Sequence, residues 1–136
     1  MPMKGAKKHL ARLRKLAGPE ATRIGGAVAY EGADTIRAEA HRLVSAGSVS
    51  GRGHVPSAEG EPPNRDTGTL QANFETVQTG PASAEFRSNA PYAAALEFKP
   101  GSRGGRPYVR PARDNKIDEI RARFIAQMDA FVKRSG

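Results

Sequence analysis

The chain has 136 residues and a formal net charge of +8 at pH 7, with five Phe, three Tyr, no Trp and no Cys. This length suits one compact domain, and the few aromatic residues indicate a thin core that a partner would complete. The lack of cysteine excludes disulfides and thiolate-ligated metal sites. No stretch approaches the roughly 18 apolar residues of a membrane span or the apolar core of a secretory signal, so we expect a soluble protein made in the cytoplasm.

The first predicted element is a short basic amphipathic helix over residues 4–16. Leu10, Leu13 and Leu16 recur every three residues, which places them on one side of a helix. The segment contains no acid, and its cations are Lys4, Lys7, Lys8, Arg12, Arg14 and Lys15. Such a charge attracts polyanions, although a basic face that contacts only water is the alternative. Gly18-Pro19 ends this helix and favours the start of another.

A second, longer helix is predicted over residues 19–46. Its apolar residues recur at helical spacings and trace one face: Ile24, Val28, Ile36, Ala40, Leu43 and Val44. Gly25, Gly26 and Gly32 interrupt this pattern, and each costs on the order of 0.5–1 kcal/mol relative to alanine inside a helix. They predict a kink or the close approach of a neighbouring backbone, with a loose solvent-facing turn as the alternative.

Residues 47–68 form a long predicted loop, rich in Gly, Pro, Ser and charged residues and without periodicity. A connection of this length inside a compact domain is typically a binding element or a disordered segment. We interpret it as an arm that becomes ordered on docking, and Thr67-Gly68 as the turn that closes it.

Two strands are predicted after this loop. Residues 69–79 alternate between apolar and polar, and residues 82–88 alternate again after Gly80-Pro81. A hairpin or meander is the simplest connection between them. The following segment, residues 89–98, is compatible with both a short helical turn and an irregular strand.

The strongest local pattern predicts a C-terminal helix after a Gly-rich basic loop at residues 99–106 and an extended segment at residues 106–112. Pro111 fits its first turn, Lys133 and Arg134 suit its C-terminus, and three acids are expected near its N-terminus: Asp114, Asp118 and Glu119. Its apolar stripe comprises Ile117, Ile120, Phe124, Met128 and Phe131. We expect this stripe to be core, so that Phe124→Ala costs roughly 3–5 kcal/mol.

Together these elements predict an α+β fold with a long N-terminal helix, a small antiparallel sheet with a long loop, and a C-terminal helix packed on the sheet. We expect a basic N-terminal helical segment at residues 1–18 and a single α+β domain at residues 19–136.

The sequence predicts no catalytic, metal or cofactor site, and hence a protein that is not an enzyme. His9, His41 and His54 lie far apart, and none has a second histidine at the spacing of a metal pair. The candidate members of a nucleophilic triad share one flexible loop that would not fix their geometry: His54, Ser57, Glu59 and Asp66. The Gly-rich loop with Arg103 and Arg106 lacks the Lys-Ser/Thr ending of a phosphate-binding loop.

A succession of short motifs runs along most of the chain. An Ala-rich helix to Val44 precedes a Pro-Pro loop that closes in Thr67-Gly68-x-Leu70, followed by Ala90-Pro91-Tyr92-Ala93, Leu96-Glu97-Phe98 and the segment at residues 106–112. This order resembles the small tail-component family of long-tailed phages typified by gene product ten of an HK-type lambdoid phage, similar in role to the lambda minor tail protein Z. The family usually has Glu-Phe-Gly-Thr where this chain has Glu97-Phe98-Lys99-Pro100, so the turn after Phe98 departs from the pattern.

The resemblance implies a structural protein of the virion neck or tail. Copies would form a sixfold ring between the head-closure (stopper) protein and the tail terminator or major tail tube protein, around a channel for genomic DNA. The implied subunit contacts are Thr67, Gly68, Leu70, Tyr92, Glu97, Phe98, Arg106, Pro107, Tyr108 and Arg110. For the aromatic residues among them, a place in the core is the alternative that we favour.

The competing hypothesis is a basic nucleic-acid-binding module. It rests on the basic helix at residues 4–16 and on Arg103, Arg106 and Arg110. It predicts an affinity for DNA that falls steeply with salt, whereas a ring subunit that only surrounds DNA would bind it weakly. In either case the basic helix and Arg103 are the expected contacts with DNA, the channel or a partner.

Overall fold

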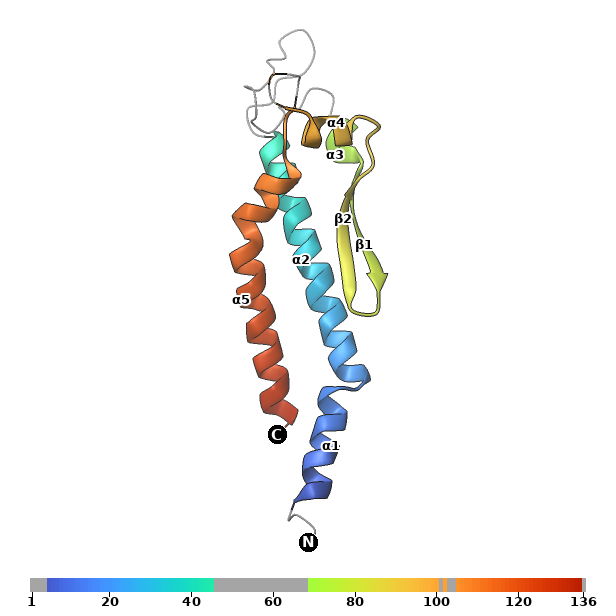
Figure 1. The fold of residues 1–136 in the computed structure, drawn as a ribbon, viewed down its shortest axis with the longest axis vertical. Helices are drawn as coiled ribbons and strands as arrows, with labels where there is room; N and C mark the ends of the chain where they lie inside the picture. Colours follow the sequence, from blue (N-terminus) through green and yellow to red (C-terminus); the bar gives the residue numbers. More distant parts are fainter. Residues whose placement is uncertain (1–4, 46–68, 101, 103–104, 136) are drawn as a thin grey trace.

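The computed structural model describes residues 5–45, 69–100, 102 and 105–135. Its elements are, in order, α1 (Ala6–Leu16), α2 (Pro19–Ser45), α3 (Thr69–Ala72), β1 (Phe74–Gly80), β2 (Ser83–Ser88), α4 (Ala93–Phe98) and α5 (Val109–Ser135). The molecule is elongated, with α5 on one side of α2 and the hairpin on the other, and the predicted α+β class is confirmed (Figure 1). The predicted loop at residues 47–68 lies outside the described residues.

Helix α2 is the element on which the others pack. It begins at Pro19, after the break at Ala17 and Gly18, and it continues without interruption to Ser45, so the predicted bounds are confirmed to within one residue. Its glycines mark close approaches. A Cβ atom at Gly26 would collide with the backbone carbonyl of Pro81, and one at Gly32 would lie only 3.0 Å from Cγ2 of Ile120.

Strands β1 and β2 form an antiparallel hairpin in which Phe74 pairs with Ser88 and Thr76 with Phe86. The prediction that the first strand starts at residue 69 is wrong, because residues 69–72 form the short helix α3. Leu70 and its neighbour Gln71 are both buried. A strand sends neighbouring side chains to opposite faces, whereas a helical turn can direct both inward. The segment at residues 89–98, left open by its sequence, ends in helix α4.

The main core lies at the end of the molecule where α3 and α4 meet α2 (Figure 1). Its buried residues come from four helices and the segments beside them: Ala40, Val44, Leu70, Ala90, Ala93, Tyr108 and Ala112. Phe74 connects the hairpin to this core, since its ring stacks on Tyr108 at 5.5 Å and meets Phe86 edge-on at 5.2 Å. The start of α5 therefore packs on the sheet, as predicted, while the rest of α5 follows α2.

Helix α5 contradicts two details of the sequence prediction. Phe131 is buried, but Phe124 is 47% exposed, so the prediction that Phe124 belongs to the core is wrong for the single chain. The Phe124 side chain lines a groove that no described residue covers. The expectation that acids crowd the N-terminus of α5 is also wrong, because none lies in its first turn.

Candidate assembly surfaces

The N-terminus of α5 is capped by a carboxylate from another helix. Glu97, in the last turn of α4, accepts hydrogen bonds from the backbone nitrogens of Tyr108 at 2.9 Å, Val109 at 3.1 Å and Arg110 at 2.9 Å. The first N–H groups of a helix have no partner within it, and together they carry partial positive charge. One side chain therefore satisfies three of these donors and joins α4 to α5.

Tyr108 lies beneath this cap and is fully buried. Its hydroxyl group donates a hydrogen bond to Oγ of Ser88 at 2.7 Å, which connects the start of α5 to strand β2. Burial raises the pKa of Tyr108 above its ordinary value, and hydrogen bonding with the Ser88 hydroxyl partly opposes that rise. The Tyr108 ring therefore supports the fold in its neutral form.

The structure divides the residues that the sequence assigned to subunit contacts into internal and external groups. Leu70 and Tyr108 belong to the core, and the carboxylate of Glu97 is used within the chain. Arg106 and Pro107 are half-buried. The exposed members are Tyr92, Phe98 and Arg110, of which Phe98 is 78% exposed. Four of the proposed contact residues lie outside the described part of the chain: Lys4, Thr67, Gly68 and Arg103.

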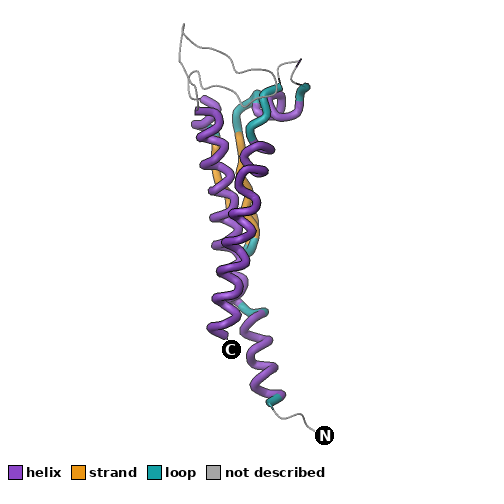
Figure 2. Tube along the Cα trace, turned by 90° about the vertical axis from the view of Figure 1, so that its left-hand side faces the viewer, coloured by secondary structure: helices purple, strands orange, loops and turns teal. Residues whose placement is uncertain are grey.

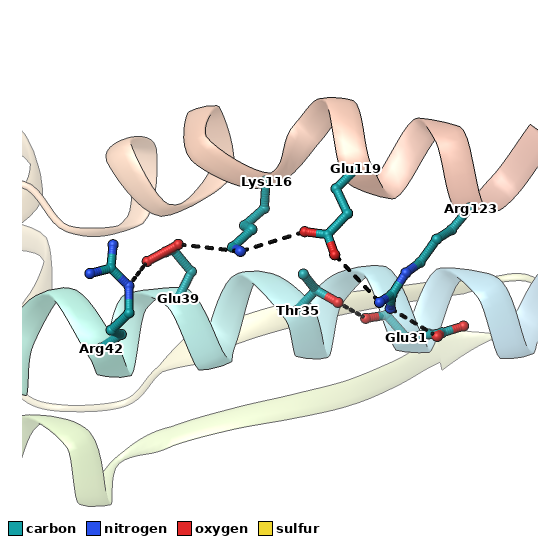
Figure 3. Close-up of polar contacts among 7 residues, drawn as sticks. All are labelled: Glu31, Thr35, Glu39, Arg42, Lys116, Glu119 and Arg123. Atoms are coloured by element: carbon teal, nitrogen blue, oxygen red, sulfur yellow. Dashed lines mark hydrogen bonds and ion pairs between the residues drawn. The ribbon is translucent and has the colours of Figure 1, made fainter.

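A row of charged side chains follows one side of the α2 and α5 pair (Figure 3). Glu39, 5% exposed, pairs with Arg42 and lies 3.7 Å from Nζ of Lys116. Farther along, Arg123 contacts Glu31 at 3.1 Å and Glu119 at 3.4 Å. Exposed ion pairs contribute little stability, so we assign this row mainly to fixing the register of the two helices.

An apolar groove of about 700 Å³ lies along α2, between α5 and the hairpin. Small residues of α2 and the hairpin line it, including Gly25, Ala29 and Ala84, and larger apolar residues of α5 form one wall. Only Glu85 and Arg121 among its lining residues are charged. Phe124 and Ile125 stand at the rim, 47% and 58% exposed. Exposed apolar surface of this kind is typical of an interaction site.

Helix α1 projects beyond the α2 and α5 pair at the end opposite α4, as both views show (Figures 1 and 2). None of its residues is buried, and Leu10 and Leu13 are 47% and 49% exposed. Leu16, at its C-terminal end, packs against the second core cluster, which contains Ile24, Val28 and Phe131. The predicted cations of α1 are all exposed: Lys7, Lys8, Arg12, Arg14 and Lys15. This helix therefore presents both an apolar and a basic face to its surroundings.

No group of three or more His, Asp or Glu side chains in the described part of the chain could hold a metal ion. None of the described helices is both long enough and apolar enough to cross a membrane.

A family model described as "Bacteriophage HK97-gp10, putative tail-component" matches residues 7–98. The chain belongs to this family. The match extends from α1 through the hairpin to the end of α4, so it includes Glu97, whereas the motif at residues 106–112 lies beyond it. A tail component is a structural part of the virion. Comparison with curated proteins gave no match, and comparison with solved structures gave none either.

Sequence reasoning missed two features of this tail-component protein. The ion pairs across α2 and α5 join residues far apart in the sequence, 92 positions for Glu31 and Arg123, and no local spacing indicates them. The apolar rim of the groove did leave a signal. Arg121 and Ile125 follow Ile117 at steps of four residues, so they continue the groove lining along a side of α5 next to Phe124.

Proposed function

We propose that this protein is a subunit of the head–tail connector, or neck, of a long-tailed bacteriophage. Copies form a sixfold ring that joins the head-closure protein to the tail terminator or tail tube and leaves a channel through which genomic DNA passes. The observation that most supports this proposal is the uncovered apolar groove beside α5. The core of the single chain is small, since the largest fully buried side chains among the described residues are Tyr108 and Val44. Burying that groove between copies would add the apolar contact that the single chain lacks.

The elongated shape gives such a subunit two ends with different chemistry. Tyr92, Phe98 and Arg110 are exposed around the capped joint of α4 and α5, where a hollow of about 580 Å³ includes Phe98 and Arg110 in its lining. The other end carries the basic helix α1 (Figure 1). We assign the joint to contacts with a neighbouring neck or tail protein, and residues 1–18 to a basic segment separate from the domain at residues 19–136.

Two measurements test this proposal. Light scattering on the purified full chain should give the mass of a closed oligomer rather than of one copy. Negative-stain images of particles made without this gene product should show heads and tails that have failed to join. Normal, infectious particles without the protein would contradict a role in the neck.

A second candidate function, binding of nucleic acid, is favoured by one observation. The five described cations of α1 are exposed, and none pairs with an acid in the described part of the chain. Gel shifts with duplex DNA at low and moderate salt separate the two functions. Tight binding that weakens steeply with salt, and that is lost in Arg12→Glu with Lys15→Glu, would support it. Binding that is weak even at low salt would favour the ring subunit.

A further inference from the structure

Two apolar surfaces of this chain lack a partner, and they complement each other. One is the groove between α2, the hairpin and α5, whose rim exposes Phe124 and Ile125. The other is the apolar side of α1, which exposes Leu10 and Leu13. A concave apolar surface and an amphipathic helix are the two halves of a common recognition mode, in which the helix lays its apolar face into the groove.

The lengths of the two surfaces agree. Helix α1 has 11 residues, which at 1.5 Å per residue span about 16 Å. The groove follows α2 from Gly25 to Ile36 and α5 from Ile117 to Met128, and at the same rise per residue each of these spans is about 18 Å long. The small side chains along α2 and the hairpin leave room for another helix to approach closely.

The charges agree as well. Helix α1 contains no acid, and its charged residues are lysines and arginines beside a single histidine. On α5, Asp118 lies seven positions before Ile125 and Asp129 four positions after it, so both acids lie on the same side of the helix as this groove residue. Both are exposed, and neither forms an ion pair with a described residue. Arg121 lies on the same side and offsets part of their charge. A basic helix in the groove would bring its cations next to these two acids.

We propose that α1 of one copy docks into the groove between α2, the hairpin and α5 of the next copy. The proposal rests on the ring proposed above and names the contact that closes it. Leu16 packs against the second core cluster. Helix α1 extends beyond the end of the α2 and α5 pair (Figure 1), and no residue of α1 lines the groove of its own chain. Docking from a second copy joins two different surfaces, and repeated contacts of this kind close into rings when the rotation between copies permits.

Complementation between two variants of the full chain provides the test. Leu10→Asp with Leu13→Asp places charge on the apolar side of α1, and Ile125→Asp places charge at the rim of the groove. All three positions are exposed, so each chain should still fold. We expect each variant alone to have the mass of one copy in light scattering, because every contact needs one intact helix and one intact groove. Mixing the two should give a complex of one copy of each and nothing larger. Ala126→Asp, at an exposed position outside the groove, is the control and should assemble as the wild type does.

Cross-linking locates the contact, since the chain contains no cysteine. A mixture of Leu13→Cys and Ile125→Cys should give a disulfide-linked dimer on oxidation. When Ala126→Cys replaces Ile125→Cys, the yield of this dimer should fall at least about tenfold, because Ala126 lies outside the proposed contact. Variants that keep the wild-type mass, or a link formed within a chain carrying both cysteines and not between chains, would overturn the docking and leave the ring intact. A wild-type chain that remains a single copy would overturn the ring itself, and this contact with it.

Discussion

The carboxylate of Glu97 lies 2.9 Å from the backbone nitrogen of Tyr108, at the point where the chain enters α5. With the two further bonds to Val109 and Arg110, it occupies the place that the sequence assigned to the acids of α5 itself. A cap delivered from α4 also fixes how α5 leaves the core. The backbone nitrogen of Arg106, which donates to the carbonyl of Leu96 at 2.6 Å, holds the same joint from the other side.

We expect Glu97→Ala to lower the free energy of unfolding by about 1–3 kcal/mol, because it removes the acceptor of three helix N–H groups. Glu97→Gln keeps an oxygen acceptor but loses the charge, so its cost should be smaller. Urea unfolding of the two variants measures the difference. Glu85→Ala, at an exposed position of β2, is the control, and an equal effect of Glu85→Ala and Glu97→Ala would show that the cap adds nothing.

Local patterns predicted the longer helices of this fold, α1, α2 and α5. The bounds of α2 follow from Gly18-Pro19 and from the spacing of its apolar residues, and they are confirmed. The same reasoning was wrong at residues 69–72, because four residues are too few to distinguish alternation from one helical turn. Leu70 is buried in one core cluster with Val44 of α2 and with Tyr108, both of which are distant from it in the sequence.

The candidate surfaces could be predicted only in part. Periodicity placed Phe124 on the apolar side of α5, but it carries no information on whether another element covers that side. The two motifs that contain Glu97 and Tyr108 were recognised. Their role inside the chain depends on the contact between α4 and α5, which spacing alone does not specify. Charge composition, by contrast, identified the basic helix α1 directly.

The two phenylalanines of α5 should differ in their cost. Phe131 is 3% exposed, so Phe131→Ala should lower the free energy of unfolding by about 3–5 kcal/mol. At concentrations where the chain is a single copy, Phe124→Ala should lower the free energy of unfolding by less than about 1 kcal/mol, because about half of the Phe124 side chain is already exposed to solvent. Thermal or urea melts at low concentration compare the two, and equal losses would contradict the open groove.

Substitutions in the row of ion pairs should lower the free energy of unfolding most at its buried end, where Glu39 lies. Glu39→Ala removes a buried carboxylate and leaves Lys116 without its contact to α2, so we expect a loss of about 1–3 kcal/mol. Glu31→Ala breaks exposed contacts to Arg123 and Gln127 and should cost less than about 1 kcal/mol. Equal values in urea unfolding would mean that burial of Glu39 does not distinguish the two sites.

Asp34 should make the packing of the hairpin on α2 depend on pH. Its Oδ1 atom accepts hydrogen bonds from Nε of Arg37 at 2.7 Å and from Oγ1 of Thr76 at 3.0 Å. The bond from Arg37 is the main reason that the pKa of Asp34 lies below its ordinary value of 3.8. A lowered pKa stabilises the fold above the unfolded value, and this stabilisation is lost as the pH falls through the folded value.

The stability of the wild type and of Asp34→Asn should therefore converge as the solution is acidified. Because Asp34 is nearly half exposed, the difference near neutral pH should stay below about 1 kcal/mol. Urea midpoints measured from about pH 6 to about pH 2 follow both chains across the range in which aspartate titrates. A gap that stays constant on acidification would exclude Asp34 as its source.

Tyr108 should respond at the opposite end of the pH scale. Burial is the main cause that raises its pKa above the ordinary value of 10.0, so the neutral ring contributes stability below that pH, and this contribution is lost as the pH rises through the folded value. Absorbance titration of the wild type minus Tyr108→Phe isolates its ionisation, which should occur at higher pH in the folded chain than in urea. Tyr108→Phe should also cost about 1–2 kcal/mol by removing the bond to Ser88, and the exposed Tyr30→Phe should cost nothing measurable. If Tyr108 ionised at the same pH in both states, its place in the core would be wrong.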